Sequence, residues 1–126
     1  MVNIQMKRIY EPYAPEDGFR VLADRLWPRG VSKERARLDL WADAIAPSNE
    51  LRKEYHGGTI GWQEFEGKFR RELAENPFVD EFVEIIRGMD NTVTLLFAGK
   101  DTENTHVKVL IEVIREKNRP VIQKRA

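Results

Sequence analysis

The sequence predicts an α/β fold with three layers, in which helices flank a mainly parallel sheet, and a single domain spans residues 1–126. Three observations lead to this prediction. Strand-like patterns occur near the N-terminus, an apolar β-branched run occurs near residue 95, and several amphipathic helical segments lie between them. Strands joined by long helical crossovers pair in parallel. The length of 126 residues fits one domain, and no linker or repeat divides the chain.

The N-terminal part is expected to supply two strands. Apolar and polar residues alternate over 2–7, as in a half-buried strand. Residues 11–18 contain two prolines, an aspartate and a glycine, which favours a loop. A second strand is predicted over 20–27. It ends before Pro28, because the residue preceding a proline prefers an extended backbone and the proline breaks the ladder.

The middle of the chain is expected to be helical. Ser32 is a good N-cap for a short helix over 33–38. Residues 40–46 are apolar and fit either a strand or a helix. Ser48 is the predicted cap of the next helix, which ends near His56. Two longer amphipathic helices follow, the first marked by Trp62, Phe65, Phe69 and Leu73, and the second opened by Asn76-Pro77 and stopped near Gly88.

The C-terminal part is expected to return to the sheet. Residues 92–98 form a nearly continuous apolar run, which is typical of a strand covered on both faces. Gly99, Lys100 and Asp101 then turn the chain into a long helix over 102–118. Residues 120–122 are a candidate for a short last strand.

Composition excludes several classes of function. Lysine plus arginine number 21, as do aspartate plus glutamate, and zero net charge argues against a dedicated nucleic-acid-binding protein. The chain has no cysteine, so disulfides, thiolate nucleophiles and cysteine-ligated metal centres are excluded. No signal-peptide core or run of ~20 apolar residues is present. We therefore expect a cytoplasmic protein that makes no use of a membrane.

His106 is the first candidate site residue. At 100° per residue, it falls within the apolar arc of the last predicted helix, so its side chain faces the protein. It also follows the strand that ends at Ala98, close to the edge where α/β proteins form crevices. Two interpretations are open: a buried histidine satisfied by a backbone carbonyl, or a functional imidazole.

Charged residues cluster at the two predicted strand ends. A charge at the end of an apolar strand is costly unless it is paired or faces a crevice. Arg25 or Arg29 would clamp a carboxylate or phosphate, or form a salt bridge that orders the turn. Asp24 and Arg25 point to opposite faces if the strand stays regular. Lys100 would add a cation beside a helix start, and Asp101 is either a site residue or the helix N-cap.

Other chemistry lacks its sequence signature. The two histidines, His56 and His106, are 50 positions apart, and no metal-ligand spacing is present, so we expect no dedicated metal site. Neither a nucleotide-binding glycine motif nor a nucleophile elbow occurs. No cofactor is therefore expected, and no motif decides between catalysis and binding.

The leading hypothesis is a small enzyme or binding protein for an anionic small molecule. The residues expected to hold the anion are Arg25, Arg29 and Lys100. His106 is the candidate acid/base, oriented by Asp24 or Asp101. One alternative is a non-catalytic interaction module whose charges are structural. Another is weak nucleic-acid binding through residues 25–37 and nearby aromatic rings.

Three motifs carry a resemblance to a known family. They are RVLADRLWPRG followed by SKE at 20–34, Trp41 followed by APS and ELR up to Arg52, and TLLFAGKD at 94–101 followed by Asn104 and His106. The chain resembles the YeaO-like family, which is built on domain of unknown function 488, over about residues 4–117. The resemblance implies a small cytoplasmic prokaryotic α/β protein and brings no activity. The chain departs from the family at His56, where an extra histidine is common, and at Gly99, where alanine is common.

Overall fold

The computed structural model describes residues 2–118 and contains a four-stranded sheet in which all neighbouring strands are parallel. The strand order is β1-β4-β2-β3, with β1 Asn3–Arg8, β2 Phe19–Leu22, β3 Leu40–Trp41 and β4 Thr92–Phe97. The α-helices are α1 Lys33–Ala36, α2 Asn49–His56, α3 Trp62–Ala74, α4 Pro77–Arg87 and α5 His106–Asn118. Two short 3-10 helices are η1 Pro15–Asp17 and η2 Asp43–Ile45. The predicted α/β fold with a parallel sheet is confirmed.

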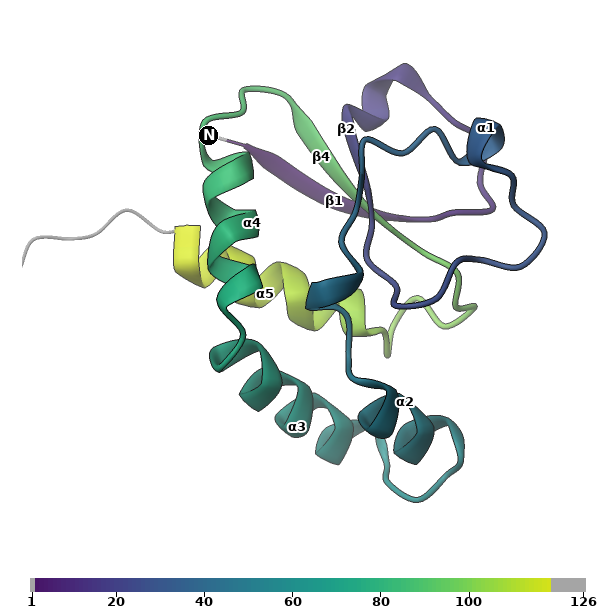
Figure 1. Ribbon diagram of the computed structural model, residues 1–126, viewed down its shortest axis with the longest axis vertical. Helices are drawn as coiled ribbons and strands as arrows, with labels where there is room; N and C mark the ends of the chain where they lie inside the picture. The colour runs from purple at the N-terminus through teal and green to yellow at the C-terminus, as the bar shows by residue number, and fades with distance from the viewer. Residues whose placement is uncertain (1, 119–126) are drawn as a thin grey trace, which may run out of the picture.

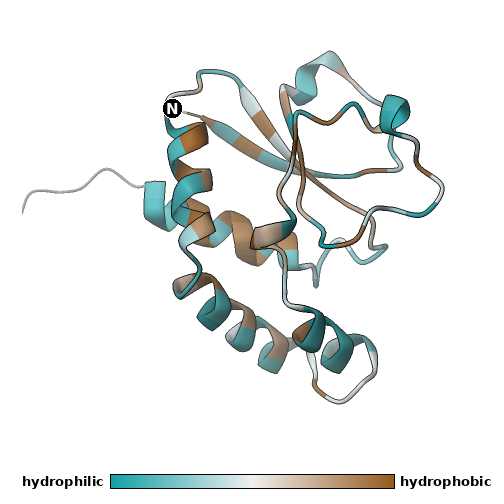
Figure 2. Ribbon diagram, in the orientation of Figure 1, coloured by the Kyte–Doolittle hydropathy of each residue, from teal (hydrophilic) through white to brown (hydrophobic). Residues whose placement is uncertain are grey.

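The two faces of the sheet are covered unequally (Figure 1). Helices α3, α4 and α5 pack on one face, where alternate strand residues such as Val93 and Leu95 enter the main core. The other face is covered by the thin layer of α1 and its flanking loops, around Leu22 and Leu96. Hydrophobic residues accordingly run along α4 and α5, whereas α1 is hydrophilic (Figure 2). The sheet is therefore the middle of three layers, with three helices on one face and only α1 and loops on the other.

The strand β4 has the covering that its sequence predicts. It lies between β1 and β2, and residues 93–97 are all buried. Residues 3–8 form the half-buried edge strand β1, as their alternation indicates. The candidate strand at 120–122 lies outside the described residues.

The predicted caps of three helices are also confirmed. The Ser32, Ser48 and Asn76 side chains accept hydrogen bonds from the backbone N–H groups of the first helical turns of α1, α2 and α4. These bonds satisfy backbone donors that have no partner inside the helix. Helix α4 ends at Arg87, next to the predicted stop at Gly88. None of the described helices is both long and apolar enough to cross a membrane.

The predicted strand over 20–27 is wrong in extent, because β2 ends at Leu22. The N–H of Ala23 still donates to the Leu96 carbonyl at 2.9 Å. The N–H of Ala98, just after β4, instead donates to the Asp24 carboxylate at 2.9 Å. A side chain thus replaces the backbone as acceptor, and the ladder stops.

The predicted start of the last helix is wrong as well. Helix α5 begins at His106 and not at Thr102. The Asp101 carboxylate accepts the backbone N–H groups of Glu103 and Asn104, both at 2.9 Å, and so closes a turn well before the helix instead of capping it. Thr105 Oγ1 accepts the Val107 N–H at 3.3 Å and is the side chain at the helix start.

Candidate functional site

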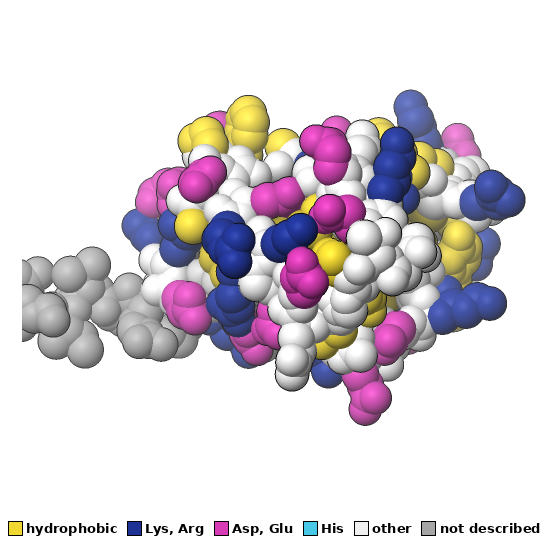
Figure 3. Space-filling model, turned by 90° about the horizontal axis from the view of Figure 1, so that it is seen from below, with side chains coloured by type: hydrophobic (Ala, Val, Ile, Leu, Met, Phe, Trp, Pro, Cys, Tyr) yellow, Lys and Arg dark blue, Asp and Glu magenta, His cyan; other side chains and the backbone are white. Residues whose placement is uncertain are grey.

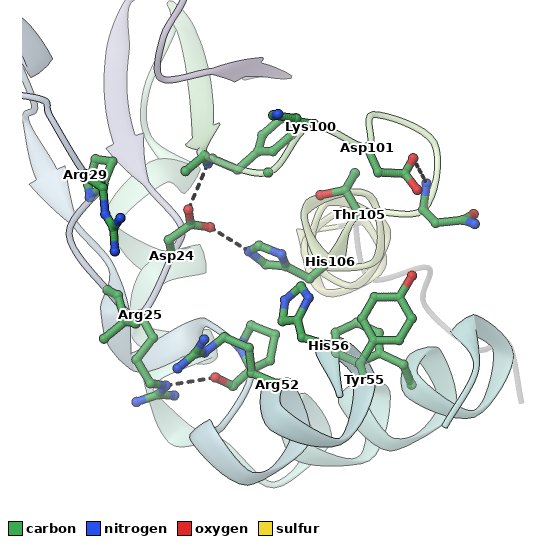
Figure 4. A pocket seen from close by; sticks show the side chains of 18 of the residues that line it. Asp24, Arg25, Arg29, Arg52, Tyr55, His56, Lys100, Asp101, Thr105 and His106 are labelled. Carbon is green, nitrogen blue, oxygen red and sulfur yellow. Dashed lines mark hydrogen bonds and ion pairs between the residues drawn. The ribbon is translucent and has the colours of Figure 1, made fainter. Parts of the chain in front are cut away.

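A cavity of about 690 Å³ lies at the carboxyl ends of β2 and β4. Its walls come from the turn after β2, the segment between β4 and α5, and helices α2 and α3. All six residues that the sequence singles out line it, namely Asp24, Arg25, Arg29, Lys100, Asp101 and His106. The position at the carboxyl edge of a parallel sheet is where α/β proteins usually bind ligands. Figure 4 shows Asp24 next to His106, with Arg25 and Arg29 on one side of this pair and Asp101 in the loop on the other.

The Asp24 side chain lines this cavity and connects the end of β2 to the end of β4 and the start of α5. Its Oδ1 lies 3.1 Å from His106 Nε2, and its Oδ2 accepts the Ala98 N–H at 2.9 Å. Asp24 itself follows β2, Ala98 follows β4, and His106 begins α5. Both side chains are about one-fifth exposed, at 17% for Asp24 and 20% for His106. The pair is therefore reachable from the cavity and held rigidly by the fold.

The orientation of the His106 ring follows from its neighbours. Nε2 lies 2.8 Å from the Ala23 carbonyl oxygen and 3.1 Å from the Asp24 carboxylate. Both are acceptors, so this hydrogen-bond network places a hydrogen on Nε2. In the neutral ring, Nδ1 then carries the lone pair. The backbone contact expected of a buried histidine and the carboxylate contact expected of a functional one occur together on the same nitrogen.

Arg25 is engaged by the fold. Its Nε donates to the Pro47 carbonyl and its Nη2 to the Ala46 carbonyl, both at 2.8 Å. These bonds fasten the turn after β2 to the segment that leads into α2. Because β2 has already ended, Asp24 and Arg25 are not held on opposite faces of a strand, and both line the cavity.

Arg29 projects from a tight turn. The Val31 N–H donates to the Pro28 carbonyl at 3.4 Å, and Gly30 between them has a φ of 79°. That left-handed conformation at the third position of a turn is favourable for glycine. Trp27 Nε1 donates to the Val31 carbonyl at 2.7 Å and steadies the same turn. The Arg29 side chain is exposed on a well-defined backbone.

Lys100 is exposed just after the end of the neighbouring strand β4. The backbone before it is fixed by Arg8, whose Nε donates to Gly99 O at 2.7 Å and whose Nη2 donates to Ala98 O at 2.8 Å. The N–H groups that bond to Asp101 hold its pKa below the usual value. That carboxylate therefore serves the local turn, and the acidic partner of His106 is Asp24.

Helix α2 adds a wall that the sequence alone does not predict. Arg52, Tyr55 and His56 line the cavity, and their spacing of three and four residues places them on one helical face. Arg52 Nη2 contacts Asn49 Oδ1 at 3.3 Å, whereas its Nε is buried and has no hydrogen-bond partner among residues 2–118. The helical spacing was the available signal. Which face of this short helix meets the sheet edge depends on long-range packing.

The charge of the lining is net positive. Four arginine or lysine side chains face two carboxylates, with the histidines counted as neutral. Within residues 2–118, no group of three His, Asp or Glu side chains is arranged to hold a metal ion. The lining therefore places surplus positive charge beside a hydrogen-bonded imidazole.

Comparison with known proteins gives the family. A family model described as the inactive DUF488-N3 subclade matches residues 3–123. The chain is 40% identical over 114 residues to the uncharacterized protein YeaO of Escherichia coli, covering 90% of this chain and 98% of that protein. It is 32% identical over 112 residues to the uncharacterized protein Mb3100c of Mycobacterium bovis, covering 89% and 93% respectively. No solved structure shows a significant match. The chain belongs to the YeaO-like DUF488 family, in the subclade described as inactive.

Proposed function

We propose that this protein binds an anionic small molecule in the cavity at the carboxyl edge of its sheet and holds it without chemical turnover. One observation carries the proposal. Arg29, Arg52 and Lys100 line the same cavity, and none of them has an acidic partner among residues 2–118. Unpaired cations at the mouth of a cavity attract and hold anions. The description of the subclade as inactive supports binding over catalysis.

The residues have different roles in this proposal. Arg29 and Lys100 contact the anion from the two strand ends, and Arg52 contacts it from α2. Arg25 holds the turn in place, since two of its donors already bond to backbone carbonyls. His106 offers Nδ1 as a ligand acceptor while Nε2 stays bonded to the protein. An acid/base role for His106 is not required.

In the alternative, the protein is an interaction module whose charged residues are structural. Only Asp24 and Arg25 support it, because their side chains bond to backbone groups of the fold. Nucleic-acid binding has less support, because the net charge is zero and cationic and acidic side chains are interspersed over the face in Figure 3. The absence of cysteine fits the reducing cytoplasm, so we expect the ligand to be a cytoplasmic metabolite.

Calorimetric titration with inorganic phosphate, pyrophosphate and sulfate tests the proposal. We expect at least one anion to bind, and the affinity to fall about tenfold in each of Arg29→Ala, Arg52→Gln and Lys100→Ala, because each loses a charged hydrogen-bond donor. Arg71→Gln is the matched control, since Arg71 is an exposed arginine of α3 outside the cavity lining. Absence of binding, or an equal loss in the control, would contradict the proposal.

A further inference from the structure

The cavity is larger than an inorganic anion requires. Its volume of about 690 Å³ lies within the range of about 300–1,000 Å³ that is typical of sites for drug-sized ligands. A phosphate group held by Arg29 and Lys100 would fill only a part of it. The rest of the lining therefore indicates what else the ligand contains.

The helical wall of the cavity carries aromatic rings. Phe65 is buried, and the Tyr55 and Trp62 rings stack on it, with centroid distances of 4.7 Å and 5.3 Å and interplanar angles of 30° and 29°. Tyr55 and Trp62 are themselves only half-buried, and all three rings line the cavity. Aromatic surface that is left partly exposed beside cations suits a flat ring that carries a negative group.

Arg52 stands on this aromatic wall, one helical turn from Tyr55. Its Nε is buried without a partner among the residues that the structure describes, which is an unfavourable state for a charged donor. The Arg52 side chain is half-buried and lines the cavity, so a turn of its guanidinium toward the cavity would bring this donor to an acceptor oxygen of a ligand. A donor that needs an acceptor thus lies next to the aromatic rings. Figure 4 shows Arg52 and Tyr55 on the helical side of the cavity and Arg29 and Lys100 on the side of the strand ends.

We infer that the ligand combines a flat heteroaromatic ring with a phosphate group, as a nucleoside monophosphate does. This inference rests on the proposed anion-binding function and names the substrate class of the same site. The ring packs against Tyr55 and Trp62. The phosphate, whose several oxygens accept from more than one donor, lies between Arg52 on one side and Arg29 and Lys100 on the other.

Competing chemistries are separated by the choice of probe. Adenosine, guanosine, cytidine and uridine monophosphates have both parts of the ligand. Ribose 5-phosphate lacks the ring, adenosine lacks the phosphate, and indole-3-acetate joins an aromatic ring to a carboxylate. We expect at least one nucleoside monophosphate to bind about tenfold or more tightly than each of the three partial probes.

Trp62→Leu and Trp62→Phe test the position of the ring. Trp62→Leu is expected to weaken monophosphate binding about tenfold and to leave ribose 5-phosphate binding unchanged, whereas Trp62→Phe keeps a ring and most of the affinity. Phe78→Leu is the matched control, because Phe78 is an exposed aromatic residue of α4 outside the cavity lining. Circular dichroism verifies folding. If the leucine variant does not fold, Tyr55→Leu supplies the result, because Tyr55 is a half-buried ring of the same wall.

The outcomes separate this inference from the proposed function. If ribose 5-phosphate binds as tightly as every monophosphate, the ring assignment is wrong and anion binding stands. If indole-3-acetate binds more tightly than every monophosphate, the phosphate assignment is wrong. Equal losses in Trp62→Leu and Phe78→Leu overturn the assigned wall. If no phosphate compound binds, both the inference and the proposed function fail.

Discussion

Two clusters of charge lie on this sheet, and they are built in opposite ways. Beneath η1, Lys7 Nζ lies 3.0 Å from both Asp17 carboxylate oxygens, and Arg20 Nη1 bonds to the same carboxylate. The remaining Arg20 donors bond to backbone carbonyls of Ala36 and Arg37. Arg20 is 1% exposed and Asp17 3% exposed. This cluster is closed, because both cations bond to the same carboxylate inside the protein.

The cluster at the carboxyl edge is open. Asp24 and Arg25 are engaged by the fold, but Arg29, Arg52 and Lys100 have no acidic partner within residues 2–118. Paired buried charges order a structure, whereas partnerless cations beside a cavity favour an anionic ligand. The contrast predicts that substitutions in the first cluster change stability, and that substitutions of the partnerless cations change binding.

The largest effect is expected for Asp17→Ala. This change leaves the Arg20 guanidinium buried without its carboxylate, so the free energy of unfolding should fall by about 3–5 kcal/mol. Urea denaturation followed by circular dichroism measures it. Glu16→Ala, at an exposed neighbouring position, is the control and should change stability little. Equal effects of the two substitutions would show that the closed cluster is not structural.

Acid should weaken the closed cluster through the same carboxylate. Burial raises the pKa of Asp17, but the hydrogen bonds and charge of Lys7, the Ala14 N–H and Arg20 lower it by more, so it lies below the usual 3.8. A pKa that is lower in the folded state stabilises the protein above the unfolded pKa, and this stability is lost as the pH falls through the folded pKa. The urea midpoint of the wild type should fall below about pH 4. Asp17→Asn should flatten this dependence, and a curve identical to the wild type would contradict the assignment.

Arg25→Ala tests whether this arginine of the open cluster has a structural role. Loss of its two bonds to Pro47 and Ala46 should cost about 1–3 kcal/mol of stability. The same denaturation assay measures it, with Arg71→Ala as the exposed control. If Arg25→Ala is as stable as the control and only binding weakens, Arg25 belongs with the ligand-binding cations.

The smallest change in stability is expected for Lys100→Ala. The exposed ammonium has no acidic partner in the part of the chain that the structure describes, so the free energy of unfolding should change by less than about 0.5 kcal/mol. Phosphate affinity should nevertheless fall in calorimetry. Lys33→Ala, on α1 and outside the cavity lining, should alter neither quantity. A destabilisation as large as that of Arg25→Ala would place Lys100 in the structural group.

The sequence predicts those parts of the fold that local patterns determine. The apolar run of β4, the caps Ser48 and Asn76, and the stripe through Phe65 and Phe69 are local signals, and each element occurs as predicted. The ends of elements depend on distant partners. β2 stops at Leu22 because the Asp24 carboxylate accepts from Ala98, which follows β4 and lies 74 positions away in the chain.

The candidate site shows the same division. The topology of a parallel sheet brings strand ends together, which is why the six residues chosen from the sequence line one cavity. The bonds of Arg25 cross 21 and 22 positions to backbone carbonyls that no residue type reveals. The sequence does not single out Arg52 for the same reason, because only tertiary packing turns that face of α2 toward the sheet edge.

The most direct test of the central claim is a two-dimensional ¹H–¹⁵N correlation spectrum recorded during titration with inorganic phosphate. We expect the amide signals of Arg29, Gly99 and Lys100 to shift together and to saturate with one dissociation constant, while those of Asp17 and Arg20 stay in place. Shifts that are absent, or that are as large around Asp17 as at the cavity, would contradict the assignment of the partnerless cations to an anionic ligand.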